Sequence, residues 1–283
     1  MVVHRGPAGS ILVAGTARWC RYYADLFFAG GDRSCVPLGS WPVWRLPNLL
    51  ERWRPQVDLM IARVDRFTAG RFPENRFLRA PEWVRMTAAV PQDGVPFASS
   101  QARRNERLVR RHRLCWRLSH DPHDLATFVE RDYRPYTLSR FGEDAFLRSS
   151  RWFRDRFRQG GLIWIERDDD TIAGMTYAVR GRALQRLAFA CARGDAALLG
   201  TGAASATYLA SFDLARQLGC DLVDFRNCRP CLSDGLLQVK RSWGGRVAEP
   251  DDIMHDVLLE WHAATPAVTD FFARFPLVVR QGR

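Results

Sequence analysis

Short apolar runs and their polar boundaries predict alternating strands and helices at the start of the chain. The apolar run 11–14 predicts a strand, and Thr16 can cap a helix that runs through residues 19–28. A second strand is predicted over residues 58–64, after a proline-rich stretch that favours an irregular connection. The turn-forming stretch Pro91-Gln92-Asp93-Gly94-Val95-Pro96 indicates a boundary after these elements.

Helical patterns follow this boundary, and one strand lies between them. Ser99 and Ser100 can cap a helix that runs to His112, and residues 114–118 alternate as a strand. Asp121 and Pro122 suit the cap and the first position of a second helix, which we expect to end before Arg134-Pro135. A third helix is expected over residues 143–157. Its apolar stripe consists of Phe146, Phe153 and Phe157, and its neighbouring basic stripe of Arg148, Arg151 and Arg158.

The clearest pattern in the chain is a run of three strands with tight turns between them. Residues 162–166, 171–179 and 183–192 are apolar-rich, and they are separated by Asp168-Asp169-Asp170 and by Arg180-Gly181-Arg182. This arrangement predicts an antiparallel meander. A small-residue helix over 203–218 and a strand over 221–225 follow, before a helix that carries Lys240. Because the helix crosses over between the third and fourth strands, these two strands should be parallel.

These elements predict an α/β (α+β) protein of two domains. Residues 96–283 would form a mixed sheet with a meander, a crossover helix and a parallel strand pair. Residues 1–95 would form a small α/β lobe, which is either a degenerate repeat of that fold or unrelated to it.

Composition and charge restrict the partners. Of the 283 residues, 47% are hydrophobic, which predicts a globular protein, and no apolar run reaches the roughly 20 residues of a membrane helix. We therefore expect a cytoplasmic protein. The formal net charge of +11 favours anionic partners, such as nucleic acid, nucleotide phosphates or the surface of an anionic membrane, touched peripherally. The seven cysteines show no framework of spacings, so we expect reduced thiols and no metal site.

Lys240 is the only lysine among 42 strong bases, the others all being arginine. An ammonium is compact and its pKa can be lowered by burial, whereas a guanidinium is broad and nearly always charged. A position that keeps lysine in this background is therefore a candidate functional position, although chance survival on a solvated helix is the alternative.

The segment around Lys240 resembles a known family. Asp234-Gly235-Leu236-Leu237-Gln238-Val239-Lys240-Arg241-Ser242-Trp243-Gly244-Gly245 is similar to a segment of the FemAB-like (BioF2/CelD-type) acetyltransferase domain, within the GNAT acyltransferase superfamily. Asp132-Tyr133-Arg134-Pro135-Tyr136 and the closing segment Phe271 to Leu277 support the resemblance, which covers roughly residues 99–277. Val239 stands where the family usually has phenylalanine. The resemblance implies a splayed opening between the third strand of the meander and the strand after the crossover.

In the superfamily this opening holds acyl-CoA, and its pyrophosphate lies at the start of the crossover helix, where unpaired amides and the helix dipole favour an anion. The resemblance would assign that site to Gly200, Thr201, Gly202 and Ala203. Ala197, however, stands where the superfamily has glutamine or arginine. Some FemAB-like proteins use aminoacyl-tRNA instead, and their phosphate loop is likewise degenerate. A plain loop before a helix is the other interpretation.

The chemistry that the resemblance implies is attack of an amine on a thioester or ester carbonyl, which needs a base, oxyanion donors and an acid. The strand before the crossover carries no carboxylate, so Asp224 and Glu166 are the candidate bases, with a local ion pair as the alternative for Asp224. Lys240 could bind an anionic group, donate to the oxyanion or transfer a proton, and we favour the first role. The candidate substrate-binding residues are Arg134, Tyr136, Tyr208, Arg226, Asn227, Arg241 and Trp243.

Three functions therefore stand as hypotheses. The first is an N-acyltransferase that uses acyl-CoA and an amine acceptor such as an amino-sugar, amino acid or peptide. The second is aminoacyl transfer from charged tRNA, whose backbone would suit the arginine clusters around residues 103–113 and 148–158. The third is a GNAT-shaped domain that has lost catalysis and binds nucleic acid or a protein.

Overall fold

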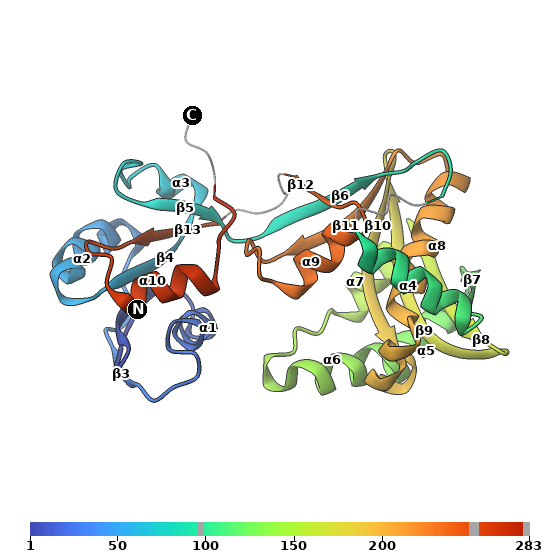
Figure 1. Ribbon diagram of the computed structural model, residues 1–283, viewed down its shortest axis with the longest axis horizontal. Coiled ribbons are helices and arrows are strands. Elements are labelled where there is room, and N and C mark those ends of the chain that lie inside the picture. The colour runs from blue at the N-terminus through green and yellow to red at the C-terminus, as the bar shows by residue number, and fades with distance from the viewer. Residues whose placement is uncertain (95–98, 249–254, 280–283) are drawn as a thin grey trace. The chain divides into compact units, whose positions relative to one another are not determined.

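The strands form two separate sheets, and the chain divides with them into two compact units. The computed structural model describes residues 1–94, 99–248 and 255–279 (Figure 1). The first unit comprises Met1–Val84, Cys228–Gln238 and the described part of Glu249–Arg283, and the second comprises Arg85–Asn227 and Val239–Ala248. Within the described ranges, no helix is both long enough and apolar enough to cross a bilayer.

The first unit is built on a six-stranded sheet with the order β3-β1-β2-β4-β13-β5. Its strands are β1 (Val2–Gly6), β2 (Gly9–Ala14), β3 (Ser34–Pro37), β4 (Leu59–Asp65), β5 (Leu78–Pro81) and β13 (His255–Glu260). Its helices are α1 (Ala17–Phe28), α2 (Leu46–Trp53), α3 (Arg66–Ala69) and α10 (Pro266–Arg274). Two short 3-10 turns, η1 (Val43–Arg45) and η2 (Arg54–Gln56), flank α2. The predicted strands at 11–14 and 58–64 and the helix capped by Thr16 are thus confirmed.

Alternating side chains of these strands build a core on each face of the sheet. Ile11 and Leu59 pack with residues of α1 and α10 on one face. Leu12 and Met60, their neighbours along the strands, pack with Leu50 of α2 on the other. The period of two follows from strand geometry, because successive side chains point to opposite faces.

The two units are not the expected contiguous domains, 1–95 and 96–283, because the second begins at Arg85 and the first also takes up Cys228–Gln238 and the C-terminal elements. β13 lies between β4 and β5, and its Val257, Leu258 and Leu259 are fully buried there. α10 packs against α1 in the same unit. The apolar pattern shows that β13 needs a sheet but does not say which one, because strand partners are chosen by tertiary packing. The expected boundary at Pro91–Pro96 lies partly outside the described residues.

The second unit contains a seven-stranded sheet with the order β12-β6-β11-β10-β9-β8-β7. Its strands are β6 (Val84–Ala89), β7 (Cys115–Ser119), β8 (Gly160–Arg167), β9 (Asp170–Arg180), β10 (Ala183–Cys191), β11 (Leu222–Cys228) and β12 (Arg246–Ala248). Its helices are α4 (Ser100–Arg111), α5 (Pro122–Thr127), α6 (Arg134–Phe141), α7 (Ser150–Phe157), α8 (Ala203–Gln217) and the last turn of α9 (Gly235–Ser242). Shorter helical segments are η3 (Phe128–Tyr133), η4 (Gly142–Asp144), η5 (Ala192–Gly194) and η6 (Ala196–Thr201).

The topology of the second unit confirms the predicted GNAT-like mixed α/β fold. β8, β9 and β10 form the antiparallel meander, α8 crosses over, and β11 returns parallel to β10. β7 extends the meander on one side, while β6 and β12 extend the sheet beyond β11. Phe212 of α8 packs edge-on against Phe225 of β11, which holds the crossover helix on the sheet.

Two predicted helices of the second unit have the wrong limits. The helix that begins at Pro122 does not end before Pro135, because the turn before it widens into the π-helix η3, in which the Arg134 N–H donates to the Val129 carbonyl. The wider turn accommodates the missing proline donor and α6 continues. The helix expected from Glu143 begins only at Ser150, where the Ser149 hydroxyl caps the Trp152 N–H at 3.2 Å. Phe153 and Phe157 are buried as predicted, but Phe146 lies before the helix and is exposed.

Candidate functional site

β10 and β11 run side by side over three residue pairs and then separate. The parallel pairing joins Ala183 to Leu222, Leu184 to Val223 and Gln185 to Asp224, although β10 continues to Cys191 and β11 beyond Asn227. On its other side β10 stays paired with β9, through a bulge between Arg186 and Phe189. Beyond Gln185, therefore, the β11-facing edge of β10 offers backbone groups that an extended ligand could pair with. The predicted splayed strand pair is confirmed.

Asp224 lies at the last paired position, where the two strands begin to diverge. Its carboxylate is fully buried, and its Oδ2 lies 3.0 Å from Nη2 of Arg85 and 3.3 Å from Nη1 of Arg226. Its Oδ1 accepts a hydrogen bond from the Arg226 N–H at 2.7 Å. The carboxylate is thus held in one orientation from two sides, at the mouth of the opening.

The backbone turns sharply directly after Asp224. Arg226 adopts a left-handed conformation with φ 60°, which is uncommon for a residue other than glycine. The Asp224 carboxylate holds its N–H, and Nζ of Lys240 donates to its carbonyl at 3.1 Å and to the Asn227 carbonyl at 2.8 Å. Non-glycine residues held in this region cluster at functional sites, where the surrounding structure maintains the strain.

Lys240 is buried, and its contacts explain why this position holds a lysine. Two of the three ammonium donors go to adjacent backbone carbonyls at the end of β11. A compact ammonium can reach both, whereas a planar guanidinium is too broad for this arrangement. Binding of an anionic group by Lys240 stays a prediction, and its two hydrogen bonds hold the backbone at the end of β11.

Trp243 and Tyr208, both expected to bind substrate, lie in the interior of the second unit. Their rings stack with centroids 5.3 Å apart and an interplanar angle of 3°, and Tyr208 also meets Phe225 edge-on. This stack joins α9 to α8 and β11 and thereby fixes the position of Lys240. Gly245 is required beside it, because a Cβ there would lie 2.6 Å from the Lys240 carbonyl oxygen.

Arg186 is a buried charge that the sequence reasoning missed. Its Nη1 donates to the Ser211 hydroxyl at 3.0 Å, its Nη2 donates to the Thr207 hydroxyl at 2.8 Å, and its Cζ lies 3.5 Å from the centre of the Tyr208 ring. Burial lowers the pKa of this guanidinium to about 10. The sequence did carry a signal for this residue, because Arg186 is the single arginine within the apolar run of β10.

The expected phosphate site at the start of α8 is more closed than the sequence suggested. Residues 196–201 form the 3-10 helix η6, in which the Thr201 hydroxyl donates to the Leu198 carbonyl at 2.7 Å. The Gly202 N–H donates to Leu199, and Gly202 and Ala203 are buried while Gly200 is exposed. A Cβ at Gly202 would lie 3.3 Å from Val109 of α4. Gly202 caps α8 without a side-chain hydrogen bond, so the following amides remain for an anion.

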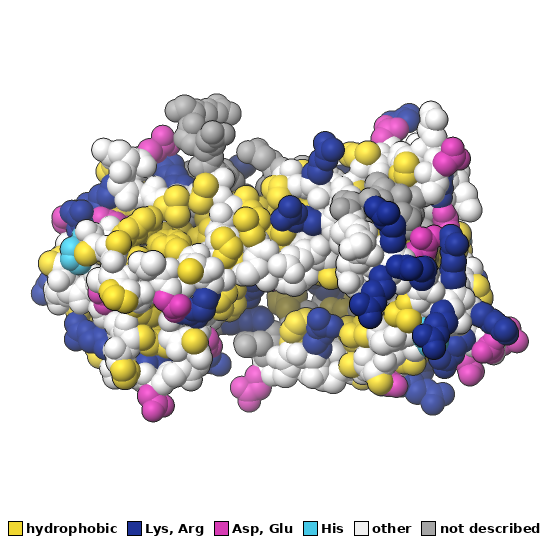
Figure 2. Space-filling view, in the orientation of Figure 1, with side chains coloured by type: hydrophobic (Ala, Val, Ile, Leu, Met, Phe, Trp, Pro, Cys, Tyr) yellow, Lys and Arg dark blue, Asp and Glu magenta, His cyan; other side chains and the backbone are white. Residues whose placement is uncertain are grey.

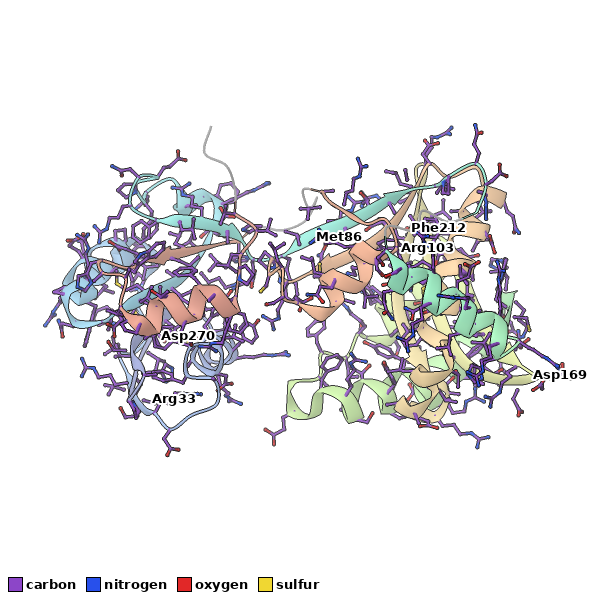
Figure 3. The ribbon with its side chains drawn as sticks, viewed as in Figure 1. Arg33, Met86, Arg103, Asp169, Phe212 and Asp270 are labelled. Carbon is purple, nitrogen blue, oxygen red and sulfur yellow. The ribbon has the colours of Figure 1, made fainter. Side chains whose placement is uncertain are left out.

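Exposed arginines cover α4, which packs against α8 with its last turn beside Gly202. Figure 2 shows Lys and Arg side chains gathered over α4, and Arg103 projects from this helix in Figure 3. The exposed members are Arg103, Arg104, Arg107, Arg110 and Arg111. Glu106 pairs with Arg110 at 2.6 Å and offsets part of this charge.

The remaining candidate substrate-binding residues differ in burial and in their contacts. Tyr136 meets Phe189 of β10 edge-on at 5.6 Å, beside the unpaired edge, and burial raises the pKa of its hydroxyl. Arg134, in contrast, is exposed and pairs with Glu130, and Arg241 is exposed at the end of α9. Arg226 and Asn227 are half-buried at the mouth of the opening.

Glu166 does not reach the opening. It lies at the end of β8, pairs with Cys115 of β7 and accepts a hydrogen bond from Arg117. β9 and β10 separate this strand from β11. Glu166 therefore lies away from the β10–β11 opening, because the meander places β9 and β10 between β8 and β11, and its role as a base stays a prediction.

Comparisons with known proteins give only distant structural likenesses. No protein-family model and no curated protein matches the chain. Among solved structures, it is similar to FemX, with 12% identity, 76% of each chain covered and a TM-score of 0.47. It is also similar to L-PGS from Bacillus licheniformis, with 10% identity, 83% of this chain and 78% of that chain covered, and a TM-score of 0.45. A GCN5-related N-acetyltransferase from Kribbella flavida has 12% identity, 80% and 77% coverage, and a TM-score of 0.34. Such distant likenesses identify neither donor nor acceptor.

Proposed function

We propose that this protein is an acyltransferase that joins an acyl group to an amine in the opening between β10 and β11. The separation of these strands after Gln185 and Asp224 carries the proposal. The unpaired edge of β10 can align an extended donor by backbone hydrogen bonds, and the start of α8 can hold an anionic part of that donor. Alignment of this kind contributes much of the rate acceleration in a direct transfer.

The reaction requires the amine nitrogen to attack the carbonyl carbon of a thioester or ester. The C–N bond forms, the C–S or C–O bond breaks, the amine loses a proton to a base, and the leaving group is protonated. Asp224 is the proposed base or orienting carboxylate, because it is buried at the divergence point. Lys240 is a proposed positioning residue that fixes the backbone after Asp224. Tyr136 is proposed to contact the donor or acceptor beside Phe189.

Acyl-CoA is the proposed donor, since both the splay and the uncapped start of α8 suit it. The test is thermal stabilisation of the full chain by acetyl-CoA, longer acyl-CoAs and CoA. A ligand at a hundredfold excess over its Kd stabilises by about 2.7 kcal/mol, which raises the melting temperature by several degrees. Absence of any shift at millimolar concentrations would exclude this donor.

Aminoacyl-tRNA is a second candidate donor, and the closed phosphate loop favours it. Gly200–Gly202 ends a 3-10 helix instead of forming an open loop, while exposed arginines follow α4 beside the start of α8. The test is binding of charged tRNA across a salt series, where five phosphate contacts would give a log–log slope of about −4. Arg107→Gln with Arg111→Gln should flatten this slope, and Arg52→Gln with Arg71→Gln, exposed arginines of the first unit outside both arginine clusters, is the matched control. If neither donor binds, the protein is a binding domain and not an acyltransferase.

A further inference from the structure

Four large apolar side chains are exposed on α6 and on the loop that leads to α7. Leu138 is 49% exposed, Phe141 53%, Phe146 62% and Leu147 37%, and we call these residues the α6–α7 apolar patch. Most other phenylalanines of the second unit, including Phe128, Phe153 and Phe212, are fully buried. Scattered exposed apolar residues are normal, but a group within ten consecutive positions indicates an interaction surface.

The loop part of the patch is fixed by the main chain. The buried Tyr133 hydroxyl donates to the Phe146 carbonyl at 3.4 Å and accepts from the Arg148 N–H at 3.2 Å. These bonds hold the backbone on both sides of Leu147, so Phe146 and Leu147 are presented outward from an anchored loop. On α6, Leu138 and Phe141 are three positions apart and therefore share one side of the helix.

Arginines accompany the two exposed phenylalanine rings. The Arg140 guanidinium carbon lies 5.7 Å from the centre of the Phe141 ring, and that of Arg148 lies 4.7 Å from the centre of the Phe146 ring. The sequence from 131 to 158 contains eight arginines and four acidic residues, and one of those acids, Asp132, is buried. The segment from 131 to 158, which carries the patch, has a formal net charge of +4, with Glu143 and Asp144 lying between Phe141 and Phe146.

We propose that the α6–α7 apolar patch docks the protein on the surface of an anionic lipid bilayer. Phenylalanine and leucine side chains can enter the boundary between headgroups and acyl chains, while the flanking guanidinium groups reach the lipid phosphates. A second copy of this chain would fit poorly, because a symmetric contact would bring the arginines of both copies together. Docking would also place α6, whose Tyr136 meets β10, next to the membrane, so an acceptor carried by a lipid would lie close to the opening.

The experiment is co-sedimentation of the full chain with vesicles of phosphatidylcholine alone or with about 30% phosphatidylglycerol. Wild-type protein should bind only the anionic vesicles. Phe141→Ser with Phe146→Ser should weaken binding at least about tenfold, because two exposed rings no longer enter the interface. Arg140→Gln with Arg148→Gln should weaken it about tenfold or more, since each arginine near such a surface contributes roughly fivefold.

The matched control is Phe67→Ser. Phe67 lies on α3 in the other unit, is 76% exposed and has the Arg66 guanidinium over its ring at 5.8 Å, so it shares the chemistry of the patch but not its setting. Its variant should bind vesicles like wild type. The inference is overturned if wild type ignores anionic vesicles, if the control loses as much binding as the patch variant, or if the patch variant loses tRNA binding and retains vesicle binding. Because the assay measures no acyl transfer, its result is independent of the proposed function.

Discussion

Among the described residues, each unit has a parallel strand pair whose first strand is followed by a helix, and the two pairs end differently. β2 and β4 stay paired from Ile11–Leu59 to Ala14–Ala62, close to the end of β2, and these positions are buried and apolar. β10 and β11 pair over three residues and open where Arg186 and Asp224 are buried. The buried charges of the second sheet need polar partners. Along the parallel pair of the first sheet, the buried positions hold apolar side chains instead.

The helices that follow β2 and β10 show the same contrast. The Thr16 hydroxyl accepts from the Trp19 N–H at 3.4 Å and so uses one of the free amides at the start of α1. α8 begins at Gly202 with no side-chain cap, which leaves its first amides for a ligand. In the first unit, the parallel strands stay paired and a side chain caps the following helix. In the second unit, the edge of β10 and the first amides of α8 remain available to a ligand. This difference is the reason for proposing the site in the second unit.

The largest expected effect is on Asp224, the buried charge at the divergence point. Asp224→Asn should lower the rate of acyl transfer by about a thousandfold, which is within the range for loss of an acid–base group. The measurement is the transfer rate with whichever donor binds, with far-UV circular dichroism to verify folding. The control is Asp221→Asn, an exposed carboxylate just before β11 that pairs with Arg182. An Asp224→Asn protein that is folded and fully active would place the chemistry elsewhere.

The first unit also buries a charge, but there the expected effect is on stability alone. Glu260 of β13 is buried and pairs with Arg76 and, at 3.0 Å, with Arg54. Glu260→Gln leaves these arginines without their buried partner and should lower the free energy of unfolding by about 3 kcal/mol. Urea unfolding measures this change. Glu51→Gln, which removes an exposed partner of the same Arg76, should cost under about 0.5 kcal/mol. Equal losses of unfolding free energy in the Glu260→Gln and Glu51→Gln proteins would contradict the larger stabilising role that we assign to the buried Glu260.

Lys240 holds the strained backbone of Arg226 beside Asp224, so its replacement should lower the rate of acyl transfer. Lys240→Met leaves two carbonyls without their shared donor and should lower the transfer rate about a hundredfold, with a loss of about 1–3 kcal/mol in stability. Lys240→Arg should not restore the rate, because the guanidinium is too broad. Arg241→Met, at the exposed neighbouring position, is the control. Full activity in both Lys240 variants would show that lysine is retained there by chance.

The sequence predicted the elements of the second unit better than its polar interior. The meander, the crossover helix and the parallel strand after it follow from period-two apolar runs and tight turns, which are local signals. The splay itself came from the family resemblance, since no local pattern specifies where two strands separate. Pro135 was misleading because a π-helical turn, which depends on packing around Phe128, accommodates it.

The candidate site was predicted in part for a related reason. Asp224 and Lys240 were found because a strand end and a rare residue type are visible in the sequence. The burial of Trp243, Tyr208 and Arg186 in one stack was not visible, because it depends on three elements meeting in space. The position of β13 in the first unit was not predicted either, because it also depends on elements that meet only in the folded protein.

The smallest expected effect is a pH dependence of stability that arises from one buried histidine of the first unit. His4 of β1 is buried, and neither ring nitrogen has a recorded partner among the described residues. Burial lowers the pKa of His4 below its ordinary value of 6.5, a nearby Arg33 lowers it further, and Asp25 acts in the opposite direction. The unfolded chain therefore takes up a proton that the folded first unit resists. The contribution of His4 to stability is fully present above pH 6.5 and is lost as the pH falls below it.

For one proton, the free energy of unfolding can fall by at most about 1.4 kcal/mol per pH unit. Urea unfolding between pH 7.5 and 5.5, a range chosen to span roughly one unit on either side of the ordinary histidine value, should show this loss in wild type. His4→Phe should flatten it, because an apolar ring in the same place takes up no proton. A His4→Phe protein with the slope of wild type would mean that other groups cause the acid sensitivity. The pH dependence would then give no contrast between the buried His4 of the first unit and the buried Arg186 of the second.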